Sequence, residues 1–279
     1  MLTSGLIYLI VVTGLFGLVI GSFLYVVAYR VPAGVSLMRE SRCPHCDAPV
    51  RWWQSVPVVS WLALRGRCAN CHASISARYP IIEAITGVAF AGVTWFFVAG
   101  DGSTRSPTGT GAWSLAAVIV AFLYFAAISI VLTLIDLDTH RLLNAIVLPS
   151  YPVAAVLLAL ACVLGADWWG LLRAGIGMAA MYVFYFVLRL VRPDGMGGGD
   201  VKLAGVVGLY LGWVGWAALA VGAFAAFLLG GVYGVVLLAS RKASRRTAIP
   251  FGPWMLAGAW TGIITGEIVG RFYGGLYGS

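Results

Sequence analysis

The chain has 279 residues, of which 61% are hydrophobic and only 10% are charged. A soluble domain carries about 25% charged residues, so this composition excludes an ordinary soluble fold and indicates that lipid is the main solvent. The net charge is +8, but the basic residues lie between apolar runs and no basic stretch is interleaved with aromatic residues, so we expect no nucleic-acid partner.

Seven apolar runs follow one another along the chain, and we expect them to lie in a lipid bilayer as helices. They cover residues 6–29, 80–100, 113–135, 145–166, 169–191, 203–239 and 252–270. The run 203–239 is too long for one span, and the stretch from Gly212 to Trp216 predicts a turn inside it. The sequence therefore predicts an all-α polytopic membrane protein with about eight segments, the sixth short enough to cross only half of the membrane.

The first apolar run does not resemble a cleaved signal peptide, because the first basic residue is Arg30 and no positive region precedes it. We expect a retained helix over 1–29 with its N-terminus outside the cytoplasm. The loops on the cytoplasmic side then hold fifteen Lys and Arg residues against three outside, as the positive-inside rule favours. This predicts a cytoplasmic loop domain over 30–79 and a helical membrane domain over 80–279, with no internal repeat.

The cytoplasmic loop contains two Cys-x-x-Cys pairs separated by 21 residues: Cys43, Cys46, Cys68 and Cys71. Four thiolates match the tetrahedral site that zinc prefers, and a bound ion would fold a loop too small to have a core. His45 or His72 could replace a thiolate, although four cysteines make this unnecessary. Disulfides are disfavoured in the reducing cytoplasm, and a redox-active site would need only one pair.

Acidic residues interrupt the apolar runs at two places. Asp136 and Asp138 end the third run, and Asp194 and Asp200 flank a glycine-rich segment. Carboxylates embedded in a membrane are costly and usually functional. Both groups lie at the cytoplasmic side in the topology above, so they can meet.

Two carboxylates that share one proton can hydrolyse a peptide bond, one acting as base toward water and the other as acid toward the carbonyl oxygen. The glycines at 197, 198 and 199 would let an extended peptide backbone come close. A phosphate-binding loop would need Lys and then Ser or Thr after its last glycine, whereas Asp200 follows here. Helix capping and placement at the membrane interface remain alternative roles for these aspartates.

Taken together, these motifs resemble the prepilin peptidase or type IV leader peptidase family, which are GxGD-type intramembrane aspartic proteases. The resemblance rests on Gly21-Ser22-Phe23-Leu24, Arg30-Val31-Pro32, the cysteine loop with Pro57 and Glu83, Ile135-Asp136-Leu137-Asp138 running to Leu142, Gly197-Gly198-Gly199-Asp200 with Lys202, and Pro250-Phe251-Gly252-Pro253. Departures from the family's usual residues occur at Tyr25, Ser55 and Leu143.

The resemblance implies residue roles. Asp136 and Asp200 are the expected catalytic pair, and Gly197, Gly198, Gly199 and Lys202 form the expected substrate loop. Asp136 is preferred to Asp138 because the family has Leu or Ile six residues after the catalytic aspartate, where Leu142 stands. The contribution of Asp138 or Asp194 stays open.

The resemblance also implies an activity. The expected enzyme is an endopeptidase of the bacterial inner membrane that removes the leader from type IV prepilins or type II secretion pseudopilins at the cytoplasmic face. Many such proteins then N-methylate the new N-terminus with S-adenosylmethionine, for which no Rossmann fingerprint is present here. The alternatives are a peptidase without methyltransferase activity, a non-catalytic zinc-ribbon scaffold, and a proton-coupled transporter, which would place its carboxylates near the middle of the bilayer.

Overall fold

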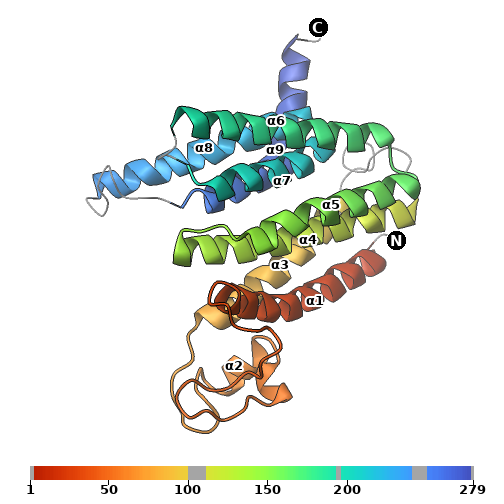
Figure 1. Cartoon of the computed structure of the whole chain (residues 1–279). Coiled ribbons are helices and arrows are strands. Elements are labelled where there is room, and N and C mark those ends of the chain that lie inside the picture. Colours follow the sequence, from red (N-terminus) through yellow and green to blue (C-terminus); the bar gives the residue numbers. More distant parts are fainter. Residues whose placement is uncertain (1–2, 100–110, 193–195, 241–249, 278–279) are drawn as a thin grey trace. The chain divides into compact units, whose positions relative to one another are not determined.

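The computed structural model describes residues 3–99, 111–192, 196–240 and 250–277, and the described elements are helical (Figure 1). The chain divides into two compact units after residue 99. The helix that follows the cysteine loop belongs to the first unit.

The first unit is built on two helices, α1 (Thr3–Arg30) and α3 (Arg78–Ala99), which pack against each other. Glycines bring their backbones together: a Cβ on Gly17 would lie 2.8 Å from the Cβ of Phe90, and one on Gly21 would lie 2.8 Å from the Cα of Glu83. Small residues allow such contact in lipid, where helices gain little from hydrophobic burial. The cysteine loop connects the two helices and carries the short elements η1 (Trp52–Ser55) and α2 (Val59–Ala63).

The second unit contains six helices: α4 (Ala112–Thr139), α5 (Asn144–Val163), α6 (Trp168–Val191), α7 (Gly198–Val214), α8 (Trp216–Ala239) and α9 (Gly252–Tyr277). The main pairs are α8 with α9, α6 with α7, and α4 with α5. The core between α4 and α7 is aromatic, since Phe125 stacks on Tyr210 with centroids 4.3 Å apart. The Tyr210 hydroxyl is satisfied by donating to the carbonyl of Ala121 at 3.0 Å.

The predicted turn inside the long apolar run is confirmed. Helix α7 ends at Val214 and α8 begins at Trp216, with Gly215 extended between them. Arg173 of α6 stabilises the break by donating to the carbonyls of Gly212 and Trp213, both at 2.6 Å. These carbonyls have no partner inside α7 because the helix ends there.

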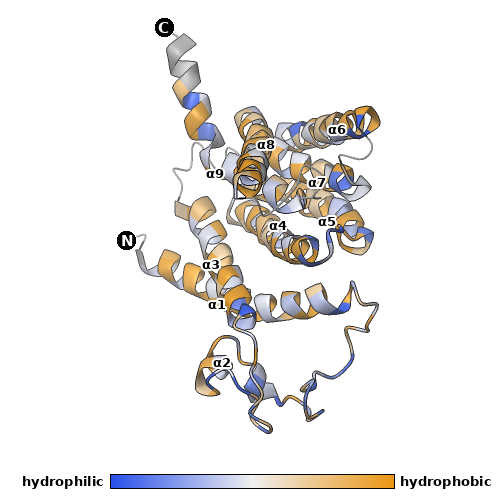
Figure 2. Ribbon diagram, turned by 90° about the vertical axis from the view of Figure 1, so that its left-hand side faces the viewer, coloured by the Kyte–Doolittle hydropathy of each residue, from blue (hydrophilic) through white to orange (hydrophobic). Residues whose placement is uncertain are grey.

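Six of the described helices are long and apolar enough to cross a membrane. They are α1, α3, α4, α5, α6 and α8. Helix α7, with 17 residues, is not among them. Hydrophobic residues run along these helices, whereas the loop around α2 contains many hydrophilic ones (Figure 2). The structure thus supports an all-helical membrane protein.

Candidate functional site

Asp136 lies in the last turn of α4 and is only 4% exposed. Its Oδ2 accepts a hydrogen bond from the backbone N–H of Gly252, at the start of α9, at 3.1 Å. Any Cβ at position 252 would lie 2.7 Å from that oxygen. A glycine is therefore required where the backbone approaches the carboxylate so closely.

Asp200 lies in the first turn of α7. Its Oδ2 accepts a hydrogen bond from the N–H of Gly197 at 3.0 Å, which fixes the carboxylate over the N-terminus of the helix. The positive end of the helix dipole favours a negative charge there. The capping role considered from the sequence is therefore real, and it also orients the side chain.

The glycines before Asp200 let α7 approach its neighbours. A Cβ on Gly199 would lie 2.7 Å from the Cβ of Leu142, in the connection between α4 and α5. A Cβ on Gly198 would lie 2.7 Å from the guanidinium of Arg189 on α6. The glycine-rich segment thus has a packing function within the folded chain.

One residue, Leu142, connects the surroundings of the two aspartates. Leu142 contacts the positions of both Gly199 and Gly252. Gly199 directly precedes Asp200 in the chain, and Gly252 donates its N–H to Asp136. Two carboxyls in one apolar environment favour a state in which they share a proton.

The remaining residues predicted for this site have different surroundings. Lys202 donates from Nζ to Oδ1 of Asn144 at 2.9 Å, which ties α7 to the start of α5. Asp138 is exposed, two residues beyond the buried Asp136. Asp194 lies outside the described residues.

Sequence reasoning missed the hydrogen bond that holds Asp136. Gly252 is 116 residues away from Asp136 in the chain, so no local pattern connects them. The signal available was the segment Pro250-Phe251-Gly252-Pro253, whose residues alone do not indicate a partner for Asp136.

The first unit contains a candidate metal centre. The four sulfur atoms of Cys43, Cys46, Cys68 and Cys71 lie within 4.8 Å of one another. Cys43 and Cys71 have their Sγ atoms 3.8 Å apart. Zinc–sulfur bonds of about 2.3 Å give a tetrahedron whose edges are about 3.8 Å, so the donor set and its spacing fit zinc. Neither histidine of the loop belongs to this cluster.

The two Cys-x-x-Cys turns have the same backbone geometry. In the first, Asp47 donates to the carbonyl of Cys43 at 2.9 Å, and in the second His72 donates to that of Cys68 at 3.0 Å. Asp47 and His72 have φ values of 54° and 57°. The prediction of no internal repeat is therefore wrong at this scale, since Arg-Cys-x-x-Cys-x-Ala occurs at 42–48 and again at 67–73.

Backbone donors prepare the cluster for a cation. The N–H groups of Cys71 and Asn70 point at the sulfur of Cys68 and lower the pKa of its thiol to about 6. Against the lowering effect of the Ala48 N–H, desolvation and the sulfur atoms of the other three cysteines raise the pKa of Cys46 to about 12, so one thiol of the set loses its proton before the other. A thiolate is the form that binds a metal.

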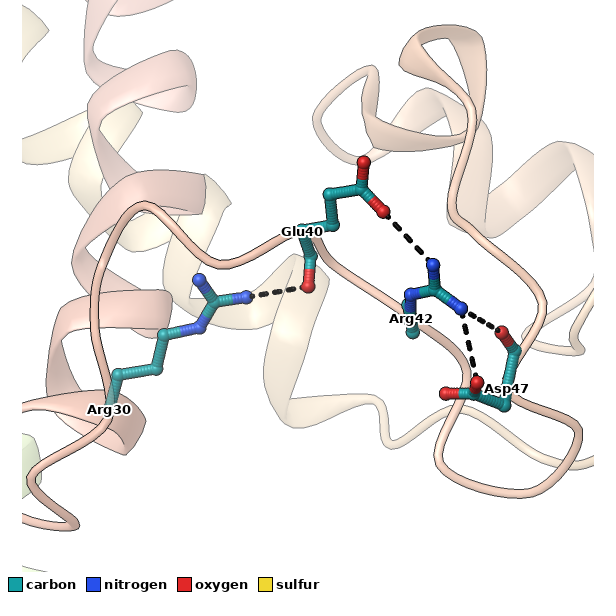
Figure 3. A network of polar contacts seen from close by, with 4 residues as sticks. All are labelled: Arg30, Glu40, Arg42 and Asp47. Carbon is teal, nitrogen blue, oxygen red and sulfur yellow. Dashed lines mark hydrogen bonds and ion pairs between the residues drawn. The ribbon is translucent and has the colours of Figure 1, made fainter.

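Two arginines hold the first turn of the loop in place (Figure 3). Arg42 pairs with Glu40 at 3.2 Å and with Asp47 at 3.1 Å. Arg30, the last residue of α1, donates to the carbonyls of Leu37 at 3.0 Å and Glu40 at 3.4 Å. These contacts connect the start of the loop to the end of the helix.

Glu83 fixes the other side of the loop. Its side chain is 2% exposed on α3, and Oε2 accepts from the N–H of Val58 at 2.6 Å. Val58 has φ of 61°, a conformation that costs energy for a β-branched residue. The hydrogen bond stabilises this strained backbone just before α2.

Comparisons with known proteins match both units. Residues 15–97 match the model of the bacterial peptidase A24 N-terminal domain, and residues 123–235 match the type IV leader peptidase family. No solved structure matches the chain.

Several relatives are similar over nearly their whole length, and each is named "Prepilin leader peptidase/N-methyltransferase". The relative from Stutzerimonas stutzeri is 32% identical over 92% of this chain and 91% of its own. Those from Pseudomonas aeruginosa and Neisseria gonorrhoeae are 30% and 33% identical, with 94% and 91% of this chain and 92% and 90% of theirs covered. This chain therefore belongs to the type IV leader peptidase family.

Proposed function

We propose that this chain is an aspartic endopeptidase that removes the leader peptide from type IV prepilins or type II secretion pseudopilins. The observation that carries the proposal is the pairing of buried Asp136 with Asp200 around Leu142. Membership of the leader peptidase family and the names of the relatives support the substrate class.

Hydrolysis by this pair needs one ionised and one protonated carboxyl. The ionised group takes a proton from water, whose oxygen attacks the scissile carbonyl carbon, while the protonated group gives its proton to the carbonyl oxygen. The gem-diol then collapses, the C–N bond breaks, and the leaving nitrogen takes a proton from the acid form of the pair. The backbone donors Gly252 and Gly197 hold the two carboxylates in fixed orientations.

The membrane arrangement proposed here has about eight segments, with α7 as a short one and the active site at the cytoplasmic face of the bacterial inner membrane. The six candidate spans and the excess of basic residues in the predicted cytoplasmic loops support it. A substrate that is itself an apolar helix would then arrive through the lipid bilayer, with the substrate loop at Gly197 to Lys202 close to its backbone.

Zinc has a structural role in this proposal. Cys43, Cys46, Cys68 and Cys71 would hold one ion, which supplies the cross-links that the loop cannot obtain from an apolar core. The equivalent backbone turns and the short sulfur–sulfur distance support this assignment.

N-methylation is a second proposed activity, with S-adenosylmethionine as the methyl donor. The names of the relatives support it, since each includes N-methyltransferase. The acceptor amine is formed only by cleavage, so methyl transfer must follow hydrolysis.

The test of the peptidase is co-expression with a tagged prepilin, scored by the mass of the pilin. Asp136→Asn and Asp200→Asn should each abolish cleavage, because one shared proton requires two carboxyl groups. Asp138→Asn is the matched control and should keep activity within about threefold of the wild type, because Asp138 is exposed. Near-normal cleavage by Asp136→Asn or Asp200→Asn would contradict the assignment.

A further inference from the structure

The hydroxyl of Tyr185 is buried and has no hydrogen-bond partner, and it is the one such side-chain atom found in the part of the chain that the structure describes. Tyr185 lies on α6 and is 0% exposed. A buried hydroxyl without a partner costs free energy, and native proteins keep few such groups. Its presence therefore calls for an explanation other than stability.

The ring of Tyr185 is held firmly by other aromatic residues. It stacks on Phe227 of α8 with centroids 5.6 Å apart, and it contacts Phe251 at 6.1 Å and Phe184 at 5.6 Å. A phenylalanine ring would make the same contacts. Packing accordingly explains the ring at this position but leaves the hydroxyl without a role.

Contacts between α6 and α7 show which face of α6 Tyr185 occupies. A Cβ on Gly208 would lie 2.8 Å from the Cβ of Met181, and one on Gly198 would meet Arg189. Tyr185 lies one turn from each of these α6 residues, on the same face of the helix. It therefore faces the part of α7 between Gly198 and Gly208, which contains Asp200.

A further contact connects Tyr185 to the site. Phe251, which touches the Tyr185 ring, directly precedes the glycine that donates to Asp136. Tyr185 thus lies on the face of α6 toward the segment that contains Asp200, and its ring touches the residue before the donor to Asp136.

We propose that Tyr185 is a positioning residue of the hydrolytic site, whose hydroxyl donates a hydrogen bond to the carboxylate of Asp200 during turnover. A carboxylate can accept about four hydrogen bonds, and the N–H of Gly197 supplies one of them. A second donor would stabilise the ionised form and fix its rotation. The inference rests on the proposed function, because it assumes that Asp200 takes part in hydrolysis.

The charged surroundings of Asp200 are limited. Asp136 lies at the end of α4, Arg189 of α6 approaches the position of Gly198, and Lys202 lies on α7 itself. His140, the residue after α4, donates its N–H to the carbonyl of Asp136. Phe227 of α8 and Phe251, the residue before α9, face Tyr185 with aromatic rings rather than charges.

The experiment compares Tyr185→Phe with Tyr182→Phe, its match on the same helix. Tyr182 is 39% exposed and stacks on Phe186. In Tyr185→Phe we expect kcat/KM for prepilin cleavage to fall about 10-fold, the effect of losing one hydrogen bond to a charged group. The acidic limb of the pH–rate profile should move to higher pH. Without the donor, the ionised form of Asp200 is less stable, so this carboxyl remains protonated up to a higher pH. Tyr182→Phe should change neither quantity.

Thermal unfolding in detergent separates this role from a structural one. Removing an unpartnered buried hydroxyl should leave the Tm of Tyr185→Phe unchanged or raise it. The inference is overturned if kcat/KM matches that of Tyr182→Phe, if it falls without movement of the acidic limb, or if the Tm falls with it. Asp200→Asn is measured alongside: full activity there would remove the proposed function as well, whereas an inactive Asp200→Asn with a normal Tyr185→Phe would remove this inference alone.

Discussion

Gly252 shows how one backbone position can orient a buried carboxylate. Its N–H donates to Asp136, and the space beside it is occupied by the same carboxylate oxygen. The sequence could predict Asp136 and Asp200, because acidic residues in apolar runs stand out. It could not predict the partner of Asp136, because that contact joins residues 116 positions apart.

Gly252→Ala should reduce prepilin cleavage at least 10-fold, because a Cβ 2.7 Å from Oδ2 must displace the carboxylate or the start of α9. The measurement is kcat/KM at matched enzyme abundance. Gly231→Ala is the control, since a Cβ there meets nothing within 4 Å. Equal activity of the two variants would show that the orientation of Asp136 is not critical.

At the scale of elements, sequence patterns predicted the helices well and their partners poorly. The turn near Gly215 was predicted because glycines interrupt an apolar run too long for one span. The similarity of the two cysteine turns was overlooked, although Arg42 and Ala48 recur as Arg67 and Ala73. The assignment of α3 to the first unit depends on packing with α1 through Gly17 and Gly21, which no local periodicity reveals.

The cysteine loop should bind one zinc ion per chain. Cys43→Ser should remove most of the metal and make the loop at 30–79 sensitive to protease, because the ion replaces a core. Elemental analysis of the purified protein measures the first effect, and limited proteolysis measures the second. The control is Cys162→Ser. This variant should keep its zinc, because Cys162 does not belong to the cluster. A metal-free wild type with four freely alkylated loop thiols would contradict the assignment.

The close contact of α6 with α7 should tolerate no large side chain. Gly208→Leu should lower the Tm in detergent or prevent accumulation of the protein, because a Cβ at 208 already meets the backbone of Gly177. Gly175→Leu, on the partner helix α6, is the control, since a Cβ there has nothing within 4 Å. Similar stability of both variants would mean that the helices can separate at little cost.

At the scale of the whole molecule, each unit corresponds to its own family model, residues 15–97 in the first and 123–235 in the second. The carboxylate pair lies in the second unit, and the four-cysteine cluster lies in the first. The sequence predicted both clusters because their residue types are rare elsewhere in the chain. This separation gives the two proposed activities different sensitivities to mutation.

Asp200→Ala should block both cleavage and methylation, because without hydrolysis no acceptor amine forms. Cys46→Ser should reduce methylation more than cleavage, since it disturbs the first unit alone. Mass spectrometry of the mature pilin N-terminus distinguishes the products, because a methyl group adds about 14 Da. A wild type that releases only unmethylated pilin would identify a peptidase without the second activity.

The glycines that bring the helices together have a genetic consequence. A single base change in a glycine codon that alters the amino acid always introduces a Cβ. At Gly177, Gly208, Gly258 and Gly262 that atom would meet the backbone of a neighbouring helix. Almost every missense allele at these codons should therefore be damaging, and saturation mutagenesis should show them to be as intolerant as the aspartate codons. A selection for loss of pilin processing would therefore recover substitutions at these glycines as well as at the two aspartates.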